Sequence, residues 1–314
     1  MLFSTCAACA LLAPPRVPQI MMAAPDIQWQ SAFVVSNIEV ARGTMQISIR
    51  PEEPVDYKPG HILGFEIAHP ETGEGLKGPY TVTRCTSNDC FDIIYRVIPD
   101  GRKTPFMEKL EPGATVRFGG KFGTPVADGM ASDVDRVVGI ATGAGIGPLV
   151  GYAEAELSSG TSKSIEVYCG FRDLADVCCR AELDALAADY PNQFRWSPII
   201  SKPMACTAVG SFAGGGSTPS LASLGLEEPE PAGPSFEQGR VSTTVPRLLG
   251  EVSATTHFHL VGNGQFVVDM QAGLLAGGVD EARVTTEKYF NGKAEADEDV
   301  VKFIADGLRV GVSA

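Results

Sequence analysis

The stretch GIATGAGIGP, residues 139–148, decides the class of fold. An apolar strand at 137–140 leads into glycines at positions 143, 145 and 147, and Pro148 then opens a helix that we expect to continue through Leu157. Glycines let the backbone turn tightly and come close to a ligand, and a helix start offers free N–H groups to a phosphate. Proline suits the first helical turn, where its missing N–H is not needed. The stretch predicts a strand–turn–helix unit that binds a pyrophosphate; a glycine-rich corner without a ligand is the alternative.

Strands and helices alternate on the C-terminal side of this stretch. We expect strands at 165–168, 194–200 and 258–261, and helices at 180–188, 243–249 and 266–275. Such alternation is typical of a doubly wound parallel sheet with helices on both faces. We therefore assign residues 133–292 to a dinucleotide-binding α/β domain.

Two segments of this half break the pattern. Residues 204–237 contain Gly214-Gly215-Gly216, several serines and an acidic, proline-rich run, with too few apolar residues to bury themselves. We expect them to form a flexible surface insertion. Residues 293–314 form an acidic C-terminal tail, in which an amphipathic turn or two over Val300–Leu308 is expected to dock on the body.

The N-terminal half, residues 28–127, shows short apolar runs separated by turn signals such as Lys58-Pro59-Gly60 and Glu111-Pro112-Gly113. Strands are expected at 32–35, 45–49, 61–67, 80–83, 91–97 and 115–118. Six antiparallel strands at this spacing predict a small β-barrel, which closes on itself and leaves no exposed sheet edge.

Composition excludes several classes of function. The formal net charge of −13 argues against nucleic acid as a partner, because its phosphates would be repelled. No apolar run approaches the roughly 18–20 residues of a spanning helix, so we expect a soluble body without a membrane span. The eight cysteines do not follow the spacing of zinc or iron–sulfur sites. We predict no metal: His257 and His259 indicate an ordinary strand end rather than a metal pair, and Cys178–Cys179 indicates structural thiols rather than a redox pair.

The first 25 residues differ from the rest of the chain. They contain one basic residue, Arg16, and the first acid is Asp26. Small residues, Ser4, Thr5 and several prolines complete the segment, as in a removable targeting peptide. We predict a chloroplast transit peptide, with the mitochondrion as the second choice; a disordered tail on a cytoplasmic protein is the alternative.

Six segments together resemble the ferredoxin–NADP+ reductase family. Besides residues 139–148, they are GPYTVTR (78–84), DGRKTPFMEKLEPG (100–113), YCGFRD (168–173), FHLVGNGQFVVDMQAGLLAGGV (258–279) and TTEKYF (285–290). They occur in the family's order and cover roughly residues 30–292. The resemblance implies an FAD-binding barrel followed by an NAD(P)-binding domain. It also implies hydride transfer between NAD(P)H and FAD, in which the protein positions one cofactor against the other.

The resemblance assigns the flavin site to the barrel. Its residues would be Gly78, Pro79, Tyr80, Thr81, Lys103 and Thr104. Tyr80 would pack on the flavin and Thr81 would hydrogen-bond near the N5 edge, where the hydride arrives. Thr104 would hold flavin phosphate, and Lys103 or Lys77 would supply positive charge.

The resemblance assigns the nicotinamide cofactor to the α/β domain. Its pyrophosphate would lie against Thr142, Gly143, Ala144, Gly145 and Ile146, and its nicotinamide against Gly262, Asn263 and Gly264. Arg172, Ser201 and Lys202 occupy the adenosine end. Cations there would favour the 2′-phosphate of NADP over NAD, although two solvated surface cations are the alternative.

Two departures from the family leave two functions open. Gly78 replaces an arginine that neutralises the FAD pyrophosphate, and Val261 replaces a cysteine near the hydride path. Lys77 or Arg84 would compensate for the arginine, or the flavin would be held more weakly. The first function is a flavin-dependent NAD(P)H oxidoreductase that passes electrons to an unidentified small molecule or protein. The alternative is a weakened or non-catalytic relative with a regulatory or scaffold role.

Overall fold

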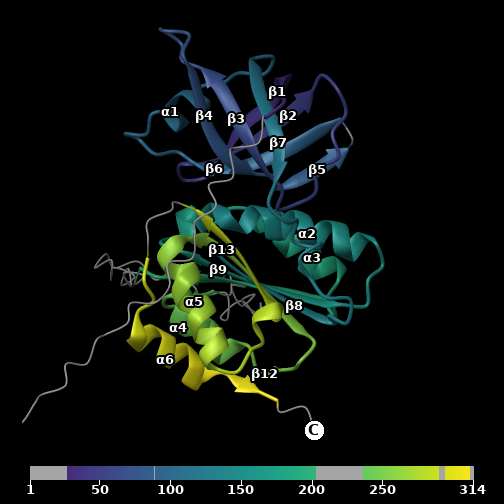
Figure 1. Ribbon diagram of the computed structural model, residues 1–314, viewed down its shortest axis with the longest axis vertical. Helices are drawn as coiled ribbons and strands as arrows, with labels where there is room; N and C mark the ends of the chain where they lie inside the picture. Colours follow the sequence, from purple (N-terminus) through teal and green to yellow (C-terminus); the bar gives the residue numbers. More distant parts are fainter. Residues whose placement is uncertain (1–26, 88, 203–235, 290–293, 312–314) are drawn as a thin grey trace, which may run out of the picture.

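The computed structural model describes residues 27–87, 89–202, 236–289 and 294–311. The predicted targeting segment and nearly all of the predicted insertion at 204–237 lie outside these ranges. Figure 1 shows two stacked parts, an antiparallel barrel above a parallel sheet with helices. None of the helices in the described ranges combines the length and the apolar character needed to cross a membrane.

The barrel contains seven antiparallel strands in the order β4-β3-β7-β1-β2-β6-β5. They are β1 (Trp29–Ala41), β2 (Thr44–Pro51), β3 (Ile62–Ala68), β4 (Gly75–Thr81), β5 (Arg84–Ser87), β6 (Cys90–Arg96) and β7 (Thr115–Phe122), with the short helix α1 (Thr104–Met107) before β7. Phe65, Phe91 and Phe118 are fully buried and fill the interior. Aromatic side chains of this size supply most of the apolar area that a small barrel buries.

The predicted barrel is confirmed with one correction, because the sequence indicated six strands. The chain leaves β4 after Thr81 and pairs again as β5, in which Arg84 lies opposite Asp92 of β6. Strand β5 is four residues long, stands at the end of the sheet order, and carries no alternation of apolar residues. Hydrophobic periodicity therefore gave no signal for it.

The second part is a six-stranded parallel sheet in the order β11-β10-β9-β8-β13-β14. Its strands are β8 (Arg136–Thr142), β9 (Ser164–Phe171), β10 (Phe194–Ile200), β11 (Glu237–Gln238), β13 (Thr256–Asn263) and β14 (Val284–Tyr289); the short strands β12 (Glu251–Val252) and β15 (Arg309–Val310) pair separately. Its helices are α2 (Ile146–Ser158), α3 (Arg180–Asp189), α4 (Val241–Leu248), α5 (Gly264–Ala276) and α6 (Glu298–Gly307).

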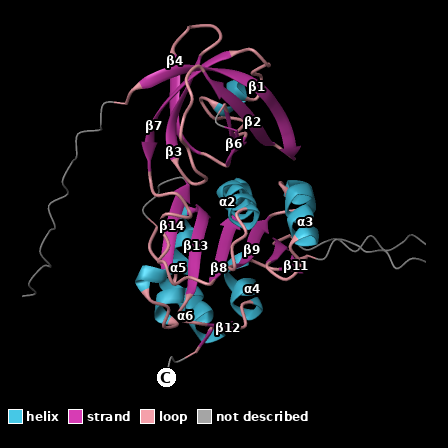
Figure 2. Cartoon of the chain, turned by 90° about the vertical axis from the view of Figure 1, so that its right-hand side faces the viewer, coloured by secondary structure: helices cyan, strands magenta, loops and turns pink. Residues whose placement is uncertain are grey.

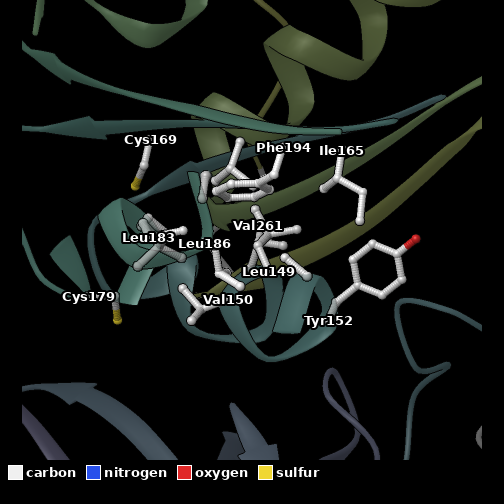
Figure 3. Packing of buried hydrophobic residues seen from close by; sticks show 14 of the residues in the cluster. Leu149, Val150, Tyr152, Ile165, Cys169, Cys179, Leu183, Leu186, Phe194 and Val261 are labelled. Atoms are coloured by element: carbon white, nitrogen blue, oxygen red, sulfur yellow. The ribbon is translucent and has the colours of Figure 1, made fainter. Parts of the chain in front are cut away.

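Alternate side chains of each strand enter two separate cores. One core lies between the sheet and the helices α2 and α3, where Leu149, Leu183 and Phe194 pack together (Figure 3). The other lies between the opposite face and α4, α5 and α6, and receives Val138 and Ile140 of β8. Helices cover both faces, so the predicted doubly wound sheet is confirmed.

Helices α2 and α3 lie on the side of the sheet that faces the barrel (Figure 2). Gly151 allows the main chain of α2 to contact the barrel, because a β-carbon at this position would overlap the carbonyl oxygen of Thr83. The Arg84 guanidinium lies 3.2 Å from the carboxylate of Glu154 on α2. At the β1–β2 hairpin, Arg42 lies 2.9 Å from the carboxylate of Asp176, which follows β9. The two parts thus meet along a packed and charged joint.

Candidate functional site

The site lies where the order of the parallel strands reverses, between β8 and β13. The chain proceeds outward from β8 in one direction through β9 and β10, and in the other direction through β13 and β14. The loops after such neighbouring strands diverge and leave a crevice at their carboxyl ends, which is where open α/β sheets bind ligands. Both predicted nicotinamide-cofactor loops, 142–146 and 262–264, lie at this point.

Close backbone packing joins these two loops. The backbone N–H of Asn263 donates a hydrogen bond to Thr142 Oγ1 at 3.1 Å. A β-carbon on Gly145 would lie 2.9 Å from the carbonyl oxygen of Val261. At Gly262, whose φ is +141°, a β-carbon would overlap the Thr142 hydroxyl. Side chains at these two positions would force the loops apart, so glycine is needed there for the two loops to pack closely.

The glycine-rich loop itself leaves one side open. Gly143 has φ +55°, and no atom of the described residues beyond Gly143 and its two chain neighbours lies within 4 Å of the position that its β-carbon would occupy. Residues 143–145 form a 3₁₀ turn that leads directly into α2. Ile146 is fully buried in the core, and its backbone N–H donates to the carbonyl oxygens of Gly143 and Ala144 within the turn, so neither its side chain nor its amide is free for a ligand. Ala144, by contrast, is partly exposed beside this core.

Strand β4 supplies the barrel side of the site. The ring of Tyr80 lies edge-on to Phe65 and Tyr95, with ring centroids 5.8 and 6.3 Å away. Thr81, the next residue, is buried, and its hydroxyl donates a hydrogen bond to Glu287 Oε1 on β14. The end of the predicted flavin strand therefore touches the parallel sheet directly.

Glu287 is a functional candidate that the sequence analysis missed. Its side chain is buried, and this burial raises the pKa of the carboxyl to about 7, although hydrogen bonds from Thr81 and Tyr289 oppose the rise. A carboxyl with such a pKa can both hold and release a proton near neutral pH. The segment TTEKYF contained the residue, but no local feature indicated that it would meet Thr81.

The predicted flavin-phosphate residues behave differently from each other. Lys103 is buried, and its ammonium donates to the carbonyl oxygen of Phe65 and lies 4.4 Å from the centroid of the Tyr80 ring. The Thr104 hydroxyl instead accepts a hydrogen bond from the backbone N–H of Ile98 at 2.9 Å, which closes its own loop. Lys103 is thus placed beside β4, whereas the Thr104 side chain is engaged locally. Gly78 and Pro79 lie on β4 itself.

The predicted adenosine residues come together after β9 and β10. Backbone hydrogen bonds join Ser201 to Phe171 at 2.9 Å and Lys202 to Arg172 at 3.0 Å. The Lys202 ammonium lies 3.9 Å from the carboxylate of Asp173, so this end of the site contains an acid as well as cations. Asp173 is a site residue that was not predicted from the sequence. A carboxylate after the second strand is the group that accepts hydrogen bonds from an unphosphorylated ribose.

The two strand histidines lie apart from these loops. His257 Nε2 and His259 Nδ1 contact the same hydroxyl, Thr285 Oγ1, at 2.9 and 2.8 Å. Burial lowers the pKa of His257 to about 4 and that of His259 to about 3, so both are neutral at pH 7. Within the described ranges, no group of three or more His, Cys, Asp or Glu side chains is placed to hold a metal ion.

Comparison with known proteins gives one family-model match. The model of the oxidoreductase NAD-binding domain matches residues 140–210, which include the glycine-rich loop and the adenosine residues. A ferredoxin–NAD(P)+ reductase component of naphthalene 1,2-dioxygenase/salicylate 5-hydroxylase systems from Ralstonia sp is 26% identical over 53% of this chain and 52% of its own. The flavodoxin/ferredoxin–NADP reductase of Escherichia coli is 23% identical over 67% of this chain and 74% of its own. The chain spans about half the length of the first curated relatives that it matches.

Solved structures share the fold at low sequence identity. A ferredoxin NADP+ reductase from Neisseria gonorrhoeae, with bound FAD and NADP, matches with a TM-score of 0.63 and 17% identity, over 83% of this chain and 99% of its own. A flavohemoglobin from Malassezia yamatoensis, with bound FAD and heme, matches with a TM-score of 0.66 and 15% identity, over 83% of this chain and 60% of its own.

Proposed function

We propose that this chain, which belongs to the ferredoxin–NADP+ reductase-like family of FAD- and NAD(P)-binding oxidoreductases, transfers a hydride between a nicotinamide dinucleotide and FAD. The electrons then leave to a separate acceptor. The observation that carries the proposal is the hydrogen bond between Thr81 and Glu287. It joins the end of the predicted flavin strand to the carboxyl edge of the parallel sheet, the place where the two cofactors must meet.

The α/β part fits a nicotinamide dinucleotide. The open side of Gly143 leaves room for a pyrophosphate, and the backbone amides of 143–145 lie directly before the long helix α2. Free amides at a helix start bind phosphate, and the reversal of strand order provides the crevice. Asn263 at the end of β13 and Gly264 at the start of α5 border the same crevice, where a nicotinamide ring would lie.

The barrel fits FAD through β4 and Lys103. When bound, FAD supplies the hydride chemistry, because it accepts two electrons from a nicotinamide and releases them to the acceptor. The Tyr80 ring would shield one side of the flavin from water, and Thr81 would orient the reacting edge. Glu287, whose pKa is about 7, would hold or release a proton at Oε1 beside Thr81.

One observation favours a second function. Gly78 gives the barrel no cation at the position where the family has an arginine. Weak FAD binding would leave a regulatory or scaffold protein that keeps the fold. Such a protein would be colourless after purification and after incubation with excess FAD.

The visible absorption spectrum separates the two functions. Purified protein is mixed with FAD, desalted, and titrated with NADPH and then NADH without oxygen. We expect flavin bands that bleach on addition of nucleotide. We also expect the protein to reduce a small dye with the nucleotide as electron donor in the absence of oxygen. A protein that retains no flavin band would contradict the oxidoreductase function. If the protein shows flavin bands that neither NADPH nor NADH bleaches, hydride transfer would be contradicted, whereas FAD binding would stand.

We also propose that residues 1–25 direct the protein to a plastid. Their composition supports the proposal, with one basic residue, no acid, and small and hydroxylated residues. A fusion of residues 1–40 to a fluorescent protein should enter plastids. Import into mitochondria or retention in the cytoplasm would overturn the proposal.

A further inference from the structure

We infer that the ammonium of Lys103 holds the pyrophosphate of FAD and does the work of the arginine that Gly78 replaces. The inference rests on the proposed function, because it concerns the flavin that the barrel would bind. It assigns the missing charge to one residue of a loop, whereas the sequence left Lys103, Lys77 and Arg84 as alternatives.

Lys103 is a buried cation that forms no ion pair with any carboxylate of the described residues. Its exposed fraction is 8%, and no carboxylate of the described residues lies within 4 Å of its ammonium. The ammonium donates to the Phe65 carbonyl oxygen and lies 4.8 Å from the Phe65 ring centroid and 4.4 Å from that of Tyr80. An ammonium has three N–H donors, so these contacts leave donors for another acceptor.

Such burial disfavours the charged form. Desolvation lowers the pKa of Lys103 from 10.5 to about 7, and the carboxylate of Glu66 only partly opposes this change. That carboxylate is shared with two surface cations, Lys77 at 3.7 Å and Arg117 at 3.4 Å. The fold alone does not repay the cost of burying the ammonium, whereas a phosphate brought by a ligand would repay it.

The ammonium occupies the space that a side chain at position 78 would enter. A β-carbon on Gly78 would lie 3.9 Å from Lys103 Nζ and 3.6 Å from Tyr80 Cε2. Gly78 and Tyr80 are two residues apart on β4 and therefore share one face of the strand. Lys103 thus places its charge on the face of β4 where the family's arginine would place its own.

The other two cations are engaged elsewhere. Lys77 lies on the opposite face of β4, where its ammonium contacts Glu66 and lies 5.0 Å from the centroid of the Trp29 ring. Arg84 lies between the barrel and the helices, 3.2 Å from Glu154 and 3.7 Å from Glu182. Neither cation reaches the Tyr80 face without leaving a carboxylate partner.

A flavin series tests the inference. Flavin-free protein and Lys103→Met are titrated at pH 7 with FAD, FMN and riboflavin, and binding is followed by fluorescence. We expect the affinity for FAD to fall about 10- to 100-fold, as for the loss of a charge-assisted hydrogen bond, while riboflavin, which has no phosphate, binds as before. Methionine removes a buried charge, so the melting temperature of the flavin-free variant should stay the same or rise.

Three further variants sharpen the result. Lys109→Met removes an exposed charge from the same segment and should leave all affinities unchanged. Lys77→Met tests the rival lysine and should change the affinity for FAD less than threefold. A β-carbon at position 78 would make only ordinary van der Waals contacts, so Gly78→Arg in the Lys103→Met background should restore the affinity for FAD and leave that for riboflavin unaltered.

The outcomes distinguish the inference from the proposed function. If the original protein binds no FAD, the proposed function fails, and the inference fails with it. If the original protein binds FAD and Lys103→Met keeps the same ratio of FAD to riboflavin affinity, the inference alone is overturned. A variant that melts earlier without flavin and loses all three flavins equally would show a structural role for Lys103 and would also overturn it.

Discussion

The hydroxyl of Thr81 donates a hydrogen bond to the carboxyl of Glu287, although 206 residues separate the two in the chain. Thr81 ends β4 of the barrel, and Glu287 lies on β14 at the edge of the parallel sheet. Both side chains are buried, so the bond is shielded from water. The contact links the two parts of the molecule at the proposed hydride-transfer site.

Replacement of Glu287 by glutamine should slow electron transfer without removing the cofactor. Glutamine keeps an oxygen acceptor for Thr81 but does not titrate, whereas the pKa of Glu287 is about 7. Loss of a positioned acid–base group typically costs about 100-fold or more in rate. We expect a fall in kcat of about this size, unchanged FAD content, and the loss of any transition near pH 7 in the profile of kcat against pH.

Stability provides a control for this variant. The pKa of Glu287 is raised in the folded state, so its contribution to stability is present below the unfolded value of 4.5 and is lost as the pH rises through about 7. Glu287→Gln without flavin should therefore gain stability relative to the original protein at pH 8 and differ little at pH 4. A gain of the same size at both values would contradict the assigned pKa.

The buried histidines should make the protein sensitive to acid. Burial lowers the pKa values of His257 and His259 to about 4 and about 3, from an ordinary value of 6.5, so the unfolded chain binds protons first as the pH falls. The stability that they contribute is present above pH 6.5 and is lost as the pH falls toward 4. In His259→Gln, urea unfolding at pH 7 and pH 5 should show a loss of stability between these values that is smaller by about 1–2 kcal/mol. An unchanged difference would mean that the acid sensitivity arises elsewhere.

Alanine at Gly151 should weaken the joint between barrel and helix. Its β-carbon would overlap the main-chain oxygen of Thr83, whereas at Gly147 it would lie 2.7 Å from the Thr83 hydroxyl, a side-chain group. Overpacking against a main chain that cannot move aside costs about 1–3 kcal/mol. Urea unfolding should therefore rank Gly151→Ala as less stable than Gly147→Ala. The reverse order would contradict the close main-chain contact.

The cations at the adenosine end should set the preference between the two nicotinamide cofactors. If Arg172 and Lys202 hold a 2′-phosphate, Arg172→Ala with Lys202→Ala should lower kcat/KM for NADPH about 10-fold or more and leave that for NADH nearly unchanged. Lys163→Ala is a suitable control, because Lys163 pairs with Glu156 near the end of α2 and not with the residues of the adenosine end. Equal losses for both cofactors, or an original protein that prefers NADH, would instead favour Asp173 as the ribose ligand.

Local signals explain what the sequence predicted well. The glycines at 143, 145 and 147 and the following Pro148 mark a strand–turn–helix unit by themselves, and the structure has this unit as β8, a 3₁₀ turn and α2. The expected strand at 194–200 coincides with β10, since most of its residues are apolar and polar residues flank it. Each of these features is specified within about 15 residues of chain.

Features that depend on tertiary contacts were not predictable in this way. Lys103 stands in a polar, turn-like segment, and nothing nearby indicates that Phe65 and Tyr80 would surround it. The sequence of strand β14 is mostly polar. Only two of its six residues are buried, and one of them is Glu287. The partner of Glu287 lies in the other half of the chain. Hydrophobic periodicity carries no information on pairing between distant polar groups.

Thr83 contacts α2 twice, with its hydroxyl facing Gly147 and its carbonyl oxygen facing Gly151. The same helix begins in the glycine-rich loop at Ile146, one residue before the first of these contacts. Main-chain atoms compress very little, so the contact at Gly151, where one main chain meets another, fixes the spacing between the proposed flavin and nicotinamide sites. The outer surface of the barrel can therefore be redesigned to accept a new electron acceptor. We expect the distance of hydride transfer to be the same in every such variant.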